Sequence, residues 1–299
     1  MMPWRRHSVG LVFSCVFVVS FFTNKFVLSV LNFTFPTLFQ GWQTLIGAIL
    51  LLLSGRLGMV EMSRITRSAA LSWLPGALLF VGNIYAGSRA LARLDIPLFF
   101  TLQNSSHVVS LLILKVIHRE RVQRLKLFSV CLMLLSAINL PQYDPQFDSR
   151  GYLWAVAHLF CVGAYRVFQV HYRPGNLSDL ERQVINYLFS VLLLAVAAHP
   201  TGDLMGALEF PSLQSHTFHC GCCASALLGF LLLLATVKLK SGLSVEHAGV
   251  WIFLSKVSAV CLSPFIFHMD VNTPSLICVL VSHMGGALLL YSDADSQTR

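Results

Sequence analysis

The sequence predicts an all-α integral membrane protein with ten transmembrane helices. Of its 299 residues, 56% are hydrophobic and only 11% are charged, and the mean hydropathy is +0.70. A soluble domain has about 25% charged residues, so a globular interior of this size could not hide the apolar surface. A soluble protein is therefore excluded. A membrane β-barrel needs many short alternating segments, whereas the apolar runs here are long and continuous.

Ten apolar runs are long enough to cross a bilayer. A spanning helix needs about 20 mostly apolar residues, because its backbone polar groups must be satisfied within the segment. We expect the first run to be a membrane helix rather than a signal peptide, since it is too long and contains Lys25. The predicted spans are 8–30, 35–54, 70–88, 95–117, 127–140, 151–171, 183–199, 219–237, 246–268 and 275–291.

The basic residues predict the orientation. The chain has 21 Lys and Arg against 13 Asp and Glu, a formal charge of +8. Most of these cations fall in alternate connections, whereas Arg89, Arg93 and Arg150 fall on the other side. The positive-inside rule then places both termini in the cytosol. We expect this basic protein to contact the lipid bilayer and not to bind nucleic acid, because a nucleic-acid-binding groove needs a polar surface around it.

A polar linker at 142–150 divides the predicted spans into two groups of five. It separates a first five-helix repeat, 1–141, from a second repeat with a short cytosolic tail, 151–299. An odd number of spans inverts the second repeat relative to the first, an arrangement found in many transporters. Alignment of the repeats matches Asn104 of the fourth span with Lys256 of the ninth. The binding site of such folds lies near the midplane, where equivalent helices meet.

Two lysines lie inside predicted spans, Lys25 in the first and Lys256 near the middle of the ninth. A lysine at a helix centre costs about 2.5–3.5 kcal/mol on insertion scales, and no Asp or Glu lies in a span interior. Snorkelling to the interface is the alternative; we expect it for Lys115 and favour it over a site role for Arg166. An unpaired cation is tolerated where it meets a cavity or an anionic ligand. The sequence therefore predicts a site for a negatively charged substrate.

Other polar groups predict a cavity wall but no catalytic centre. The run from Thr101 to His107 in the fourth span is denser than helix packing requires, although hydrogen bonding between helices is the alternative. Asn83 and Tyr85 form a similar pair in the third span. The Cys and His residues at 219–223 lack the second ligand pair of a typical zinc site. We expect no catalytic residue, no metal and no cofactor.

Several motifs resemble the nucleotide-sugar transporters of the drug/metabolite transporter superfamily, in particular the fungal GDP-mannose transporter group. The segment 23–27, Thr-Asn-Lys-Phe-Val, is similar to that group's first-helix signature, and Trp73-Leu74-Pro75 to the start of its third helix. The family's Phe-Tyr-Asn-Asn motif is matched in part by residues 184–187, which keep Asn186. Its Gly-Ala-Leu-Asn-Lys motif is matched in part by residues 252–256, which keep Lys256.

This resemblance implies an antiporter of the Golgi membrane that exchanges a cytosolic nucleotide sugar for a luminal nucleoside monophosphate. The eroded motifs favour UDP-N-acetylglucosamine first and GDP-mannose second. A multi-pass enzyme of lipid or glycan metabolism and a non-transporting accessory protein are the alternatives, and a homodimer is compatible with the sequence. The residues that we expect to bind substrate are Lys256 and Lys25 for phosphate, with Tyr85, Asn104, Asn186 and Ser255 for base, ribose or sugar.

Overall fold

The computed structural model describes residues 3–119, 121–172, 177–270 and 272–298. Residues 1, 2 and 299, which the predicted repeats include, lie outside these ranges. Helices make up the fold, and the described part of the chain has no β-strand. In chain order the elements are α1 Pro3–Lys25, the π-helix η1 Phe26–Val30, α2 Pro36–Arg56, α3 Arg67–Arg93, α4 Ile96–Asn104, α5 Ser106–Val116, α6 Arg124–Tyr143, α7 Ser149–His171, α8 Asp179–Ala198, α9 Asp203–Leu208, α10 His216–Gly242, α11 Val245–Ile266 and α12 Thr273–Thr298.

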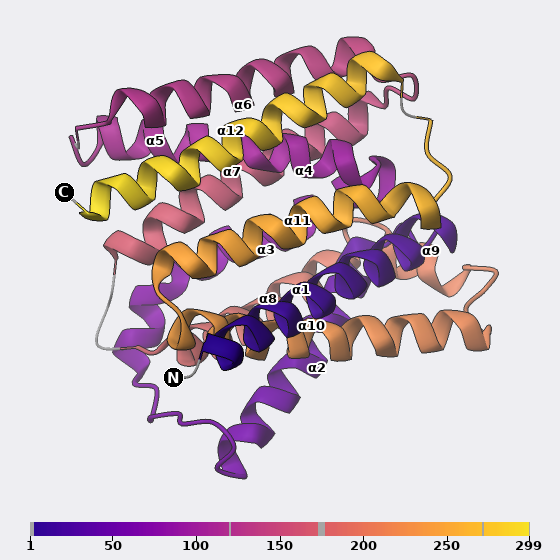
Figure 1. The fold of residues 1–299 in the computed structure, drawn as a ribbon. Helices are drawn as coiled ribbons and strands as arrows, with labels where there is room; N and C mark the ends of the chain where they lie inside the picture. The colour runs from indigo at the N-terminus through magenta and orange to yellow at the C-terminus, as the bar shows by residue number, and fades with distance from the viewer. Residues whose placement is uncertain (1–2, 120, 173–176, 271, 299) are drawn as a thin grey trace.

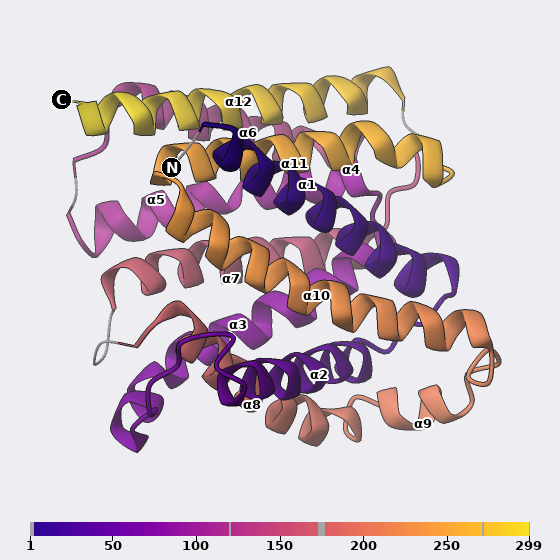
Figure 2. The same ribbon diagram turned by 60° about the horizontal axis from the view of Figure 1, so that its bottom comes forward.

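Ten helical segments of the described chain are long and apolar enough to cross a membrane, which confirms the ten predicted spans. Two of them contain more than one element, since α1 continues into η1 and α4 is followed by α5. The spanning helices run side by side through the bundle (Figure 1). The start of α1 and the end of α12 lie at one end, and the short helix α9 lies at the other (Figures 1 and 2). We call these the terminal end and the α9 end.

Local sequence signals account for several helix starts. Proline occupies the first turn of α2 and α4, where its missing N–H would have no helical partner. The Thr66 hydroxyl accepts from the Ala69 N–H at the start of α3. Ser178 and Glu181 form a reciprocal capping box at the start of α8. The connection between α6 and α7 is shorter than the predicted linker, because α6 continues to Tyr143 and α7 begins at Ser149.

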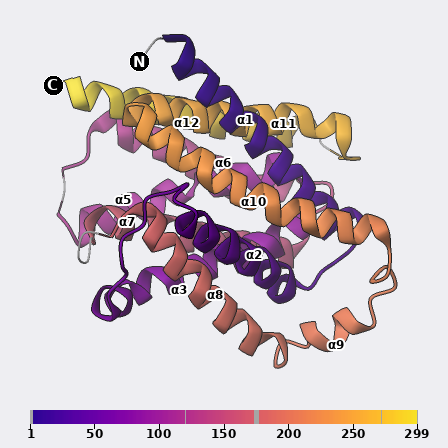
Figure 3. The same cartoon turned by 90° about the horizontal axis from the view of Figure 1, so that it is seen from below.

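The helices pack in pairs that join distant parts of the chain. The most extensive pairings are α3 with α7, α6 with α12, α1 with α10 and α2 with α8. Figure 3 shows α10 crossing the bundle beside α1 and above α2. The fourth span is the most buried of the ten within the protein, and it contacts α6, α7, α11 and α12. The fourth span therefore runs through the centre of the bundle.

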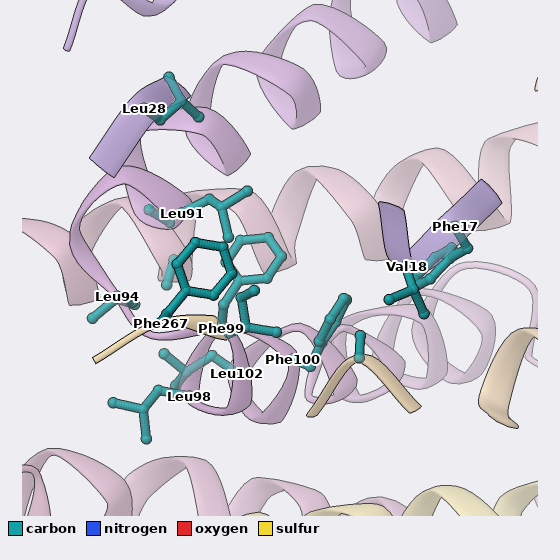
Figure 4. Packing of buried hydrophobic residues seen from close by; sticks show 14 of the residues in the cluster. Phe17, Val18, Leu28, Leu91, Leu94, Leu98, Phe99, Phe100, Leu102 and Phe267 are labelled. Carbon is teal, nitrogen blue, oxygen red and sulfur yellow. The ribbon is translucent and has the colours of Figure 1, made fainter. Parts of the chain in front are cut away.

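Aromatic side chains fill the space between the first and fourth spans. Phe100 of α4 lies with its ring centroid 5.9 Å from that of Phe17 and 4.9 Å from that of Phe21. Figure 4 shows Phe99 and Phe100 among the leucines of α3 and α4, with Phe267 close by. This apolar cluster fixes the position of α4 immediately before the polar residues that follow it.

Candidate functional site

The fourth span is interrupted at its centre, between Asn104 at the end of α4 and Ser106 at the start of α5. The N–H of Ser105 donates to the carbonyl of Leu102 at 3.0 Å rather than to that of Thr101. The freed Thr101 carbonyl accepts a hydrogen bond from the Ser282 hydroxyl of α12 at 3.4 Å. Irregular backbone at membrane depth is tolerated where it is buried in protein or lines a cavity. Interrupted helices are also typical of transporter binding sites.

Lys256 of α11 reaches this interruption. Its Nζ donates to Oδ1 of Asn104 at 3.3 Å and lies 5.7 Å from the ring centroid of Phe100. Nδ2 of Asn104 donates to the Ser282 hydroxyl at 3.3 Å, so α4, α11 and α12 meet at one polar point. Within the described residues Lys256 forms no ion pair with a carboxylate. The structure thus brings together the two polar interruptions that the sequence aligns, and it leaves the lysine's charge uncompensated.

A second cation, Arg166 of α7, lies on the other side of the interruption. Its NH1 donates to Nδ1 of His107 at 2.8 Å, and its NH2 donates to the Ser106 hydroxyl at 3.4 Å. Because a guanidinium can only donate, His107 accepts at Nδ1 and carries its proton on Nε2. Arg166 therefore turns into the bundle instead of snorkelling. The sequence showed an arginine inside a span, but it did not reveal the partner on α5.

Polar side chains continue from this point toward α3. Nε2 of Gln103 lies 3.1 Å from Nε2 of His158, and Nδ1 of His158 lies 3.0 Å from the carbonyl oxygen of Asn83. His158 is only 5% exposed. The run from Thr101 to His107 thus contacts α7, α11 and α12 directly and is linked to α3 through His158, so it serves helix–helix hydrogen bonding as well as forming a candidate site.

Lys25 lies at a different place, where α3 ends and α4 begins. Its Nζ donates to the carbonyls of Leu91 at 3.1 Å and Leu94 at 2.9 Å, and the residue is 4% exposed. A cation is favourable at a helix C-terminus, where carbonyls lack helical partners. Burial raises the pKa of the Asp95 carboxyl next to it, and the positive charge of Lys25 opposes that rise. Lys25 therefore has both hydrogen-bond acceptors and a nearby carboxylate, which the sequence did not indicate.

These partners predict that Lys25→Gln lowers stability more than it lowers substrate affinity. Loss of a charged hydrogen bond to buried carbonyls costs about 1.5–3 kcal/mol. The measurement is the melting temperature of purified protein in detergent, together with the substrate concentration that gives half-maximal exchange in liposomes. A role of Lys25 in phosphate binding predicts the reverse, a normal melting temperature with a much higher half-saturating concentration.

The other predicted site residues have partners of their own. Asn186 accepts from Nε1 of Trp73 at 2.9 Å and donates to the Tyr165 hydroxyl at 2.7 Å, in a cluster of α3, α7 and α8. The Ser255 hydroxyl lies 2.8 Å from that of Ser14 on α1. These contacts place Asn186 and Ser255 on faces other than the one where Lys256 meets Asn104.

Tyr85 lies in a further group of polar side chains, toward the α9 end. Its hydroxyl accepts from Arg89 at 3.1 Å, and Arg89 also pairs with Asp203 of α9 at 3.4 Å. Of the six predicted binding residues, the structure thus joins Lys256 and Asn104 by a hydrogen bond.

Comparisons with known proteins give the chain its family. No family model matches it. It is 54% identical over 293 residues to a protein of Xenopus laevis named UDP-N-acetylglucosamine transporter TMEM241 homolog, which covers 98% of this chain and 99% of that protein. It is 47% identical over 294 residues to the UDP-N-acetylglucosamine transporter TMEM241 of Mus musculus, with the same coverage.

More distant similarities agree with these. The nucleotide sugar transporter SLC35D2 of Homo sapiens is 25% identical over 226 residues, which are 75% of this chain and 66% of that protein. A solved crystal structure superposes with a TM-score of 0.60 at 15% identity, over 94% of this chain and 96% of the other, which supports the fold. The similar proteins are named as transporters, not enzymes, so the resemblance seen in the motifs is confirmed. The chain belongs to the nucleotide-sugar transporters.

Proposed function

We propose that this chain carries UDP-N-acetylglucosamine from the cytosol into the Golgi lumen in exchange for UMP. The observation that carries this proposal is the contact between Lys256 and Asn104 at the interrupted fourth span. A lysine without a carboxylate suits a phosphate, because the low dielectric of the site strengthens their attraction. UDP-N-acetylglucosamine and UMP share a uridine and a phosphate, so one site can bind each of them in turn.

The names of the similar proteins support this choice of sugar nucleotide. Both relatives that match almost the whole chain are called UDP-N-acetylglucosamine transporters. GDP-mannose is the second candidate, since a GDP-mannose transporter of Komagataella pastoris is 27% identical over 188 residues. The Phe-Tyr-Asn-Asn motif of that group keeps only Asn186 here, which favours the uridine nucleotide.

The packing supports two inverted repeats of five spans, 1–141 and 151–299, on either side of the linker. The order of the spans makes each helix of the first repeat equivalent to one of the second. The equivalent helices are α1 and α7, α2 and α8, α3 and α10, the fourth span and α11, and α6 and α12. Under this equivalence, the packed helix pairs correspond to one another. The pair α3–α7 then corresponds to α10–α1, and α3–α8 corresponds to α10–α2. The pairs α2–α8, α4–α11 and α6–α12 correspond to themselves. Lys256 and Asn104 belong to one such self-equivalent pair, which is where a transporter of this kind binds substrate.

The charge distribution supports cytosolic termini. Exposed basic residues gather at the terminal end of the bundle, as the positive-inside rule requires of the cytosolic side. They include Arg56, Arg64, Arg67, Arg121, Arg124, Lys238 and Lys240. The α9 end would then face the lumen, and rocking of the repeats about the Lys256–Asn104 contact would expose the site to each side in turn.

Exchange in liposomes tests the proposal. Purified protein is reconstituted into vesicles loaded with UMP, GMP or buffer, and uptake of labelled UDP-N-acetylglucosamine and GDP-mannose is followed. We expect uptake of UDP-N-acetylglucosamine only into UMP-loaded vesicles. Uptake of GDP-mannose into GMP-loaded vesicles alone would identify the second candidate as the substrate. Binding of a nucleotide sugar without any counter-exchange would contradict antiport and indicate an accessory protein.

A further inference from the structure

Two cations from different helices of the second predicted repeat, α7 and α11, converge on the interruption of the fourth span. Lys256 of α11 contacts Asn104, and Arg166 of α7 contacts Ser106 and His107. The rise of a helix is about 1.5 Å per residue, so these contact points lie roughly 3–4.5 Å apart along the span. The two like charges thus contact the same stretch of the fourth span, where they repel each other. Neither side chain forms an ion pair with a carboxylate in the described chain.

The carboxylate of Asp293, whose negative charge acts on Arg166, is bound to another cation. Asp293 of α12 attracts Arg166 through space. Its carboxylate, however, is bound to Lys126 at 2.9 Å, at the terminal end of α6 and α12. Two like charges in a membrane interior, without a carboxylate in contact, raise the free energy of the empty protein. An anion bound between them would remove that cost.

From this arrangement we infer that Arg166 is a second phosphate-binding residue, which together with Lys256 holds the diphosphate of the nucleotide sugar on either side of the interruption. The inference rests on the proposed function and adds a residue to its site. Each phosphate of the diphosphate carries a negative charge, so the pair of cations matches the pair of phosphates. The planar guanidinium can form two parallel hydrogen bonds to one phosphate, whereas the lysine acts as a point charge.

His107 and Ser106 position this arginine. The histidine accepts from NH1 and the serine accepts from NH2, so the plane of the guanidinium is held by α5 while its backbone belongs to α7. His107 carries its remaining proton on Nε2, where it can donate only. Arg166 and His107 therefore both present hydrogen-bond donors to the site, which suits a phosphate.

The test compares how strongly wild type and Arg166→Gln bind ligands with and without a phosphate. Affinities of purified protein for UMP, UDP-N-acetylglucosamine and uridine are measured by calorimetry in detergent. We expect the variant to bind both phosphate-bearing ligands about 10- to 100-fold more weakly, the value of a charged hydrogen bond. Its affinity for uridine, which has no phosphate, should stay within about twofold of wild type. Arg166→Lys keeps the charge without the planar pair of donors. Its affinity for the phosphate-bearing ligands should therefore fall between those of wild type and Arg166→Gln.

Lys240→Gln is the matched control, because it removes an exposed cation near the end of α10, away from Arg166, and should leave all three affinities unchanged. Wild-type affinity for UMP in Arg166→Gln would overturn the inference. Equal weakening for UMP and uridine, without recovery in Arg166→Lys, would overturn it in favour of a purely structural arginine. If wild type prefers GMP and GDP-mannose, the UDP-N-acetylglucosamine proposal fails, and the same comparison with GMP and guanosine still decides the role of Arg166.

Discussion

Nucleotide-sugar exchange is expected to be lost in Lys256→Ala, while the protein remains folded and inserted. The Nζ of Lys256 contacts Asn104 and the face of Phe100, and no carboxylate of the described chain pairs with it. Its removal leaves no buried carboxylate unpaired, so stability should fall little. Removal of one partner of a buried charge pair costs 2–5 kcal/mol of binding, which corresponds to a loss of at least about 30-fold in affinity.

The measurement is UMP-dependent uptake into liposomes, with melting temperature as the check on folding. Lys240→Ala is the control, because Lys240 is an exposed lysine near the end of α10. We expect that variant to transport like wild type. Normal uptake by Lys256→Ala would remove Lys256 from the site and with it the main support for the proposed binding mode.

Gly163→Ala should impair both stability and transport, because α7 packs closely against the interrupted span at this glycine. A Cβ atom at residue 163 would lie 2.6 Å from the carbonyl oxygen of Ser106 and 2.7 Å from Cβ of Val109. The Ser110 hydroxyl also donates to the carbonyl of Gly163 at 3.0 Å. The obstructing oxygen belongs to the backbone, so the helices must separate, at a cost of about 1–3 kcal/mol for overpacking.

Gly229→Ala provides the opposite case, because a Cβ atom at Gly229 in α10 meets nothing within 4 Å. Alanine is the better helix former by about 1 kcal/mol, so this variant should melt at or slightly above the wild-type temperature and transport normally. A normal melting temperature and a normal uptake rate in Gly163→Ala would show that α5 and α7 are not tightly coupled.

The spans could be predicted from the sequence because hydropathy is a local property. Ten apolar runs each had to form a helix that satisfies its own backbone, and all ten are present. The proposal of two inverted repeats also predicted that Asn104 and Lys256 lie near each other, since equivalent helices of such repeats come together, and the two side chains are hydrogen-bonded. The first prediction depends on each segment alone, and the second depends on the proposed symmetry between the two halves.

Features that depend on a particular distant partner could not be predicted. Arg166 was expected to snorkel because it lies near the terminal face, but His107 on α5 holds it inside. The sequence shows no partner for Lys25, whereas in the structure two carbonyls at the end of α3 accept hydrogen bonds from its ammonium group. The interruption after Asn104 has no proline or glycine to mark it in the sequence, and the hydroxyl of Ser282, far along the chain, accompanies it.

The position of Lys25 has a consequence for biosynthesis. Its two acceptors, the carbonyls of Leu91 and Leu94, follow it by 66 and 69 residues. The first span therefore leaves the ribosome with an ammonium group that has no partner in its own helix, at an insertion cost of about 2.5–3.5 kcal/mol if it enters the bilayer centre. That cost is recovered only when the third span has been made and its end folds against the first. We therefore expect the first span to be held firmly in the membrane only after the third helix has left the ribosome and packed against it.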